Sequence, residues 1–165
     1  MKPRLVLVLC SLGLIGGLQS QAAVASCASP EPAALQATWQ AFRSATLQGQ
    51  PEQVERFYRF PLKLLPPMDG SASLNITRPV FLRNYAELFQ QGPAGDEVGL
   101  LSAMKQSTGE EYITQVKFDD TQCAFIGPTR VEDYNFVYDS KAGWQIDSVY
   151  YGSDYDIARS AGLDR

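Results

Sequence analysis

The spacing of apolar residues changes part of the way along this chain, and that change restricts the fold more than any other feature. In three stretches before Val98 the apolar residues recur every three or four positions, which is the spacing of a buried helix face. From Val98 onward they alternate with polar residues, as in strands that bury one face. Helices followed by three or four long antiparallel strands predict an α+β fold.

Three helices are predicted in the first half of the chain, over residues 29–49, 51–61 and 77–92. The first begins with a capping serine followed by a proline and ends at a glycine. The second is short and is stopped by a proline, and the third is ended by a Gly-Pro pair. Their buried faces are predicted from apolar residues about one turn apart, which are Leu35, Trp39, Phe42, Val54, Phe57, Tyr58, Phe81, Tyr85 and Leu88.

Strands are predicted between and after these helices. Residues 60–64 form a strand whose internal proline suits the edge of a sheet, and residues 65–76 supply a hairpin loop and a returning strand. Three later strands are predicted at 111–118, 131–138 and 144–151, because each alternates apolar and polar residues. In the first of these, the alternation places Tyr112 and the residues two, four and six positions later on one face.

The last predicted strand contains a change of parity. It opens at Trp144, which shares a face with Ile146, whereas Val149 has the opposite parity. We therefore expect a β-bulge or a strand end near Ser148. The segment before this strand is predicted to be a hairpin loop that ends at Gly143.

The N-terminal residues have the pattern of an export signal. Lys2 and Arg4 supply a positive start, and the apolar stretch from Leu5 to Leu18 is too short to span a membrane. Ala23 and Ala25 form an A-x-A site, so cleavage is expected after Ala25. We therefore predict a signal peptide over residues 1–25, a single α+β domain over residues 26–165, and export to a bacterial periplasm.

Two cysteines remain after this cleavage, because Cys10 lies inside the leader. Cys27 and Cys123 in an oxidising compartment predict one disulfide bond. The alternative is that "VASC" (residues 24–27) is a bacterial lipobox, in which case Cys27 carries a lipid anchor to the outer membrane. Two unlinked, buried thiols are the third alternative.

Charge narrows the choice of partners. Removal of residues 1–25 takes away two of the 14 basic residues and none of the 18 acidic ones, so the net charge moves from -4 to -6. An acidic chain is unsuited to nucleic acid or anionic lipid, which both need basic surface. A basic protein partner is compatible with this charge, and binding of a small apolar ligand does not depend on the charge.

No stretch after the leader is apolar enough to span a membrane.

The order of predicted elements resembles the nuclear transport factor 2-like superfamily, which has a cystatin-like α+β fold. The resemblance is carried by "AALQATWQAFRSATLQG", "PEQVERFY", "ITRPVFLRNYAELF" and the closing "GWQIDSVYY". It implies helices packed on a strongly curved antiparallel sheet, shaped like a cone, with a pocket at the open end. The superfamily includes both enzymes and binding domains, so the fold alone does not identify a function.

The chain contains no histidine, and this excludes several chemistries. Ser-His-Asp and Cys-His catalysis both need an imidazole, and ordinary zinc sites cannot be assembled from the cysteines and carboxylates present. Asp154 and Asp156 resemble the start of a calcium loop, but the later glycine and glutamate of such a loop are absent. We therefore predict no metal site and no cofactor.

One acid–base arrangement remains as a candidate. A carboxylate in a tyrosine-lined cone can act as a base while a tyrosine hydroxyl stabilises an enolate, as the resemblance to isomerases implies. The candidate bases are Asp133 and Asp147, and the candidate hydroxyls belong to Tyr112, Tyr134 and Tyr150. Both aspartates alternate against the apolar positions, which places them on the solvated face of the sheet.

Two functions are compatible with these observations. The first is an exported, non-catalytic binding or inhibitory domain of the immunity type, which acts on a protein partner. The alternative is a small-molecule-binding or isomerase-like enzyme that uses an Asp/Tyr pocket in the cone. An open pocket with an inward carboxylate would favour the alternative.

Overall fold

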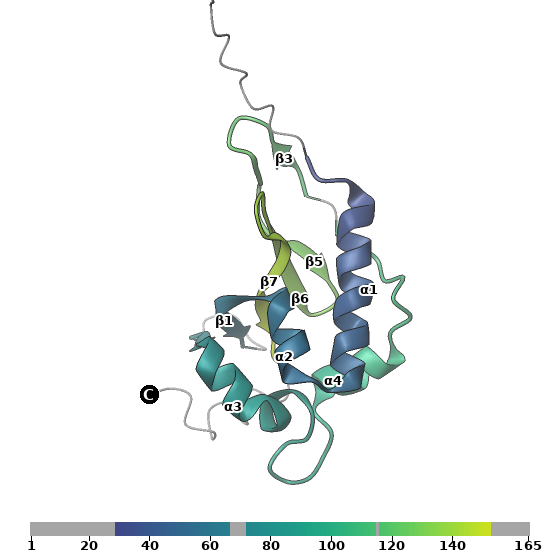
Figure 1. Ribbon diagram of the computed structural model, residues 1–165, viewed down its shortest axis with the longest axis vertical. Helices are drawn as coiled ribbons and strands as arrows, with labels where there is room; N and C mark the ends of the chain where they lie inside the picture. Colours follow the sequence, from purple (N-terminus) through teal and green to yellow (C-terminus); the bar gives the residue numbers. More distant parts are fainter. Residues whose placement is uncertain (1–28, 67–71, 115, 153–165) are drawn as a thin grey trace, which may run out of the picture.

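The computed structural model describes residues 29–66, 72–114 and 116–152. Within these ranges, four α-helices and a five-stranded sheet make an α+β fold, with an additional two-stranded hairpin (Figure 1). The helices are α1 (Pro32–Gln48), α2 (Pro51–Val54), α3 (Arg78–Phe89) and α4 (Gly99–Gln106), and a 3-10 turn η1 (Glu55–Phe57) follows α2. The strands are β1 (Tyr58–Leu65), β2 (Leu74–Ile76), β3 (Phe118–Asp119), β4 (Ala124–Phe125), β5 (Thr129–Val131), β6 (Tyr134–Asp139) and β7 (Gly143–Tyr150).

The main sheet is mixed, with the strand order β2-β1-β7-β6-β5. Strand β1 runs parallel to β7, and the other neighbouring pairs are antiparallel. The prediction of a purely antiparallel sheet is therefore wrong, and the sheet is not strongly curled (Figure 1). The parallel pairing is possible because a long connection, which contains α3, α4 and the β3–β4 hairpin, separates β1 from β7 in the chain.

Strand β1 lies inside the sheet, whereas the sequence predicts an edge strand at this place. Its register against β7 shifts between Tyr58 and Lys63, and Pro61 lies in that irregular stretch. A proline has no N–H to donate to a neighbouring strand. Because the hydrogen bonds between β1 and β7 are interrupted at this point, Pro61 can occupy a central strand. The second predicted helix is also shorter than expected, because α2 and η1 end before Tyr58 begins the strand.

Helix α1 lies beside the sheet and supplies much of the core (Figure 1). Its Trp39 and Phe42 are buried, and the ring of Phe42 lies 5.0 Å from that of Tyr134 on β6. Helix α3 reaches the same core, because Phe81 lies 5.1 Å from Tyr58 on β1. The stripes predicted for the first and third helices are therefore confirmed as buried faces.

The region from Val98 to Phe118 differs from the prediction. Residues 99–106 form α4, which buries Leu100 and Met104 at a spacing of four, so the alternation begins later than Val98. In place of the long strand predicted at 111–118, the described residues of this range (111–114 and 116–118) contain an isolated bridge at Ile113 and the start of the short strand β3. Ile113 packs against the core and Tyr112 is 82% exposed, so the buried side chain at the start of this segment is Ile113 and not Tyr112.

The last two predicted strands are confirmed from Tyr134 onward, whereas residues 131–133, predicted as the start of a strand, form the end of β5 and a turn. Strand β6 buries Tyr134 and Phe136, and β7 buries Trp144 and Ile146. The register between them shifts where Asn135 pairs with Ser148 and the next residue, Phe136, pairs with Ile146. This irregularity confirms the bulge that the parity change indicates.

Candidate functional site

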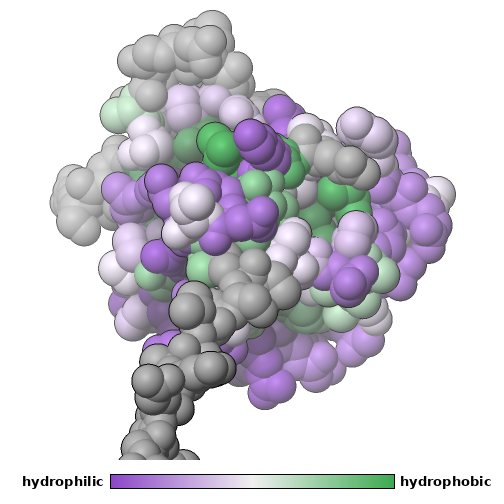
Figure 2. Space-filling view, turned by 90° about the horizontal axis from the view of Figure 1, so that it is seen from above, coloured by the Kyte–Doolittle hydropathy of each residue, from purple (hydrophilic) through white to green (hydrophobic). Residues whose placement is uncertain are grey.

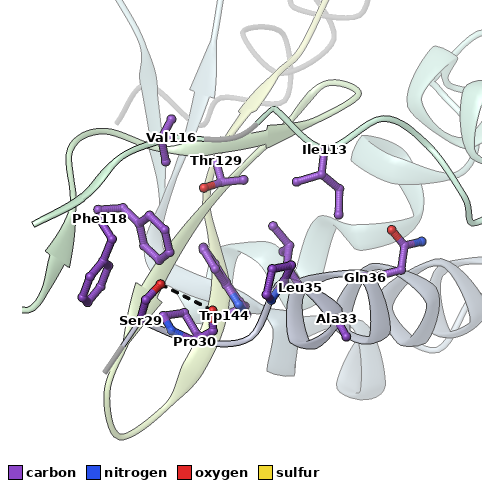
Figure 3. Close-up of a pocket in the computed structure, with 12 residues that line it drawn as sticks. Ser29, Pro30, Ala33, Leu35, Gln36, Ile113, Val116, Phe118, Thr129 and Trp144 are labelled. Atoms are coloured by element: carbon purple, nitrogen blue, oxygen red, sulfur yellow. Dashed lines mark hydrogen bonds between the residues drawn. The ribbon is translucent and has the colours of Figure 1, made fainter. Parts of the chain in front are cut away.

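An apolar pocket of about 560 Å³ lies between the start of α1 and one end of the sheet. Figure 3 shows its lining side chains arranged around a common space, with α1 on one side and β7 and β5 on the other. Figure 2 looks onto the molecule from above and shows hydrophobic surface among hydrophilic residues. The lining residues are Ser29, Pro30, Pro32, Ala33, Leu35, Gln36, Ile113, Val116, Phe118, Phe125, Thr129 and Trp144.

Aromatic rings form one wall of this pocket. Phe118 on β3 pairs with Phe125 on β4, and their ring centroids are 4.9 Å apart. Phe125 in turn lies 5.0 Å from Trp144 on β7. The two-stranded hairpin therefore extends the apolar face of the main sheet, which gives an apolar molecule a continuous surface to contact.

The pocket wall contains two polar atoms that are buried and have no hydrogen-bond partner within the described residues. They are Nε1 of Trp144 and Oγ1 of Thr129. A third polar side chain in the wall, Gln36, is already engaged because its amide donates a hydrogen bond to the carbonyl of Gly109. None of the described residues that line the pocket is charged.

The predicted catalytic residues lie elsewhere. Asp133 is in the β5–β6 turn, where its carboxylate lies 3.5 Å from Arg130 and is 45% exposed. Asp147 accepts a hydrogen bond of 3.0 Å from the hydroxyl of Ser148. Neither aspartate is among the residues that line the pocket, so the described residues supply no carboxylate base there.

The three candidate tyrosines are also separate from the pocket. Tyr134 is a core residue, and burial raises the pKa of its phenol well above the ordinary value. Tyr112 is largely exposed, and Tyr150 packs under Arg130, whose guanidinium carbon is 4.3 Å from the ring centre. The structure does not bring these tyrosines and the two aspartates together around the pocket.

A second cluster of polar residues holds the segment after α4 against α1. The carboxylate of Glu111 accepts hydrogen bonds from the indole N–H of Trp39 and from the backbone N–H groups of Thr108 and Gly109. Partial burial raises the pKa of Glu111, but these hydrogen bonds outweigh it and lower the pKa to about 2. Arg43 adds a hydrogen bond of 2.7 Å to the backbone carbonyl of Ser107.

Sequence reasoning does not single out Thr129, Ile113 or Glu111. An isolated threonine or glutamate carries no periodic signal, and the alternation places Ile113 on the face opposite Val116 and Phe118, although all three line the pocket. The described residues contain no group of three or more histidine, cysteine, aspartate or glutamate side chains arranged to hold a metal ion. Within the same residues, no helix has the length and apolar character needed to cross a membrane.

Cys123 lies in the β3–β4 turn with a φ of 53°, two positions before the pocket residue Phe125. Cys27, its predicted partner, lies outside the described residues, as do the predicted signal peptide, Asp154 and Asp156.

No protein family matches this chain, and no curated protein or solved structure matches it either.

Proposed function

We propose that this protein is a non-catalytic binding domain that holds a small apolar molecule in the pocket beside α1. The observation that carries the proposal is the pocket itself, which has a volume of about 560 Å³ and a mainly apolar, aromatic wall. Ligand pockets in proteins have volumes of roughly 300–1,000 Å³ and linings of this kind. The uncharged lining of the described residues favours binding over isomerase-type catalysis, which needs a base at the ligand.

The test is a titration with the uncharged fluorescent probe N-phenyl-1-naphthylamine. Its emission is expected to rise and saturate at one probe per protein. Val116→Phe adds a ring inside the pocket and should weaken binding by roughly tenfold, because overpacking costs about 1–3 kcal/mol. Ile126→Phe is the matched control, since Ile126 is 60% exposed and does not line the pocket. Equal affinities for both variants and the wild type would contradict the proposal.

A protein partner is the second candidate function, and two exposed apolar side chains favour it. Tyr112 is 82% exposed and Ile126 is 60% exposed, and each adjoins a pocket-lining residue in sequence. A basic partner of the kind predicted from the net charge would contact these residues at its interface core. Replacement of both by serine should abolish capture of such a partner and leave the binding of the naphthyl probe unchanged.

We also propose that the protein acts after export, with Cys27 and Cys123 joined in a disulfide bond. The pocket supports this pairing, because it is lined by both Ser29 and Phe125, which come two positions after Cys27 and Cys123 in the chain. Disulfide bonds persist in oxidising compartments such as the periplasm. The intact mass of the mature protein tests the proposal, because a disulfide removes two hydrogens whereas a lipid anchor on Cys27 adds acyl chains.

A further inference from the structure

Two polar atoms in the pocket wall have unmet hydrogen-bonding capacity. Trp144 is 8% exposed and Thr129 is 4% exposed, and neither the indole Nε1 nor the hydroxyl Oγ1 has a partner among the described residues. A buried polar group without a partner is unfavourable, and most such groups in proteins are satisfied. The other tryptophan follows that rule, because the indole of Trp39 donates to Glu111.

The sheet brings these two residues to the same face. Thr129 on β5 pairs with Phe136 on β6, and Phe136 pairs with Ile146 on β7. Trp144 is two positions before Ile146, so its side chain has the same orientation along the strand. Figure 3 shows both side chains at the pocket, with Trp144 beside the start of α1 and Thr129 farther from that helix.

We propose that the ligand of this pocket is an uncharged apolar molecule with a carbonyl or hydroxyl oxygen that accepts a hydrogen bond from Nε1 of Trp144, an atom that a small turn of the ring uncovers when the ligand binds. Thr129 supplies a second polar contact on the same wall. The inference rests on the proposed function and specifies its ligand class. An ionised ligand group is disfavoured, because no described residue in the lining is charged and burial of an unpaired charge is costly.

The test compares benzophenone with diphenylmethane, in which a methylene group replaces the carbonyl. For each protein, wild type and Trp144→Phe, the dissociation constant of benzophenone is divided by that of diphenylmethane. The difference in hydrophobicity between the two probes then cancels when the two ratios are compared. The preference for benzophenone should fall about three- to tenfold in the variant, which is the size of one uncharged hydrogen bond. Thr46→Val is the control, because Oγ1 of Thr46 is also buried without a partner among the described residues but lies outside the pocket.

A second measurement needs no variant that might fail to fold. The chain has two tryptophans, so ¹H–¹⁵N spectra contain two indole signals. Benzophenone should shift the indole proton of Trp144 downfield by more than diphenylmethane does, and should leave the signal of Trp39 in place. Equal shifts with the two probes and an unchanged affinity ratio would overturn this inference. If Val116→Phe still weakens the binding of both probes, the proposed function stands without this inference. If neither probe binds the wild type, both proposals fail.

Discussion

The indole N–H of Trp39 donates a hydrogen bond to the carboxylate of Glu111, which lies 72 positions later in the chain. The same carboxylate accepts a hydrogen bond of 3.0 Å from the backbone N–H of Gly109. The contact therefore joins α1 to the segment that leads from α4 to the pocket residue Ile113. It also satisfies a buried indole that would otherwise lack a partner.

Replacement of Glu111 should loosen this contact. Glu111→Gln removes the charge that strengthens the hydrogen bonds, so the free energy of unfolding is expected to fall by about 1–2 kcal/mol. Urea denaturation measures the change. Glu110→Gln is the neighbouring control, because Glu110 is exposed and its side chain accepts a hydrogen bond from Gln40. An equal effect of both substitutions would contradict the role given to Glu111.

The contact should also depend on pH. The pKa of Glu111 is lowered from 4.5 to about 2 in the folded protein, so its ionised form stabilises the fold. That contribution is fully present above the unfolded pKa and is lost as the pH falls from about 4.5 through 2. The difference in unfolding free energy between wild type and Glu111→Gln should shrink over this interval. A constant difference would show that the charge is not responsible.

Loss of the predicted disulfide should destabilise the protein. Cys123→Ser is expected to lower the free energy of unfolding by about 2–4 kcal/mol, because the bond to Cys27 would close a loop of roughly a hundred residues. Thermal melting with and without a reducing agent measures the effect. Cys27→Ser should cause the same loss, and reduction should have no further effect on either variant. Identical melting of the oxidised and reduced wild type would argue against the bond.

Gly49 should resist substitution. It ends α1 with a φ of 68°, and a Cβ at this position would meet the side-chain amide of Gln90. Gly49→Ala is expected to cost about 1–2 kcal/mol of stability, which is the cost of placing an L-residue in the left-handed region. Gly152→Ala is the control, because a Cβ there meets open space. If the two variants prove equally stable, this expectation is wrong.

The helix faces could be predicted because their signal is local. Trp39 and Phe42 lie about one turn apart on α1, and Phe81 belongs to the corresponding apolar stripe of α3. All three residues are buried. The bulge in β7 is also visible as a parity change between Ile146 and Val149. Alternation fails near Tyr112, because a short irregular segment with one bridge can imitate the pattern of a strand.

The α+β class and most of the core residues follow from the amino-acid sequence alone, because burial follows the periodic spacing of apolar side chains. The parallel pairing of β1 with β7 does not follow from it, and neither does the pocket that Trp144, Thr129 and the start of α1 enclose. Strand partners and pocket walls depend on contacts between residues far apart in the chain, and no local pattern specifies those contacts.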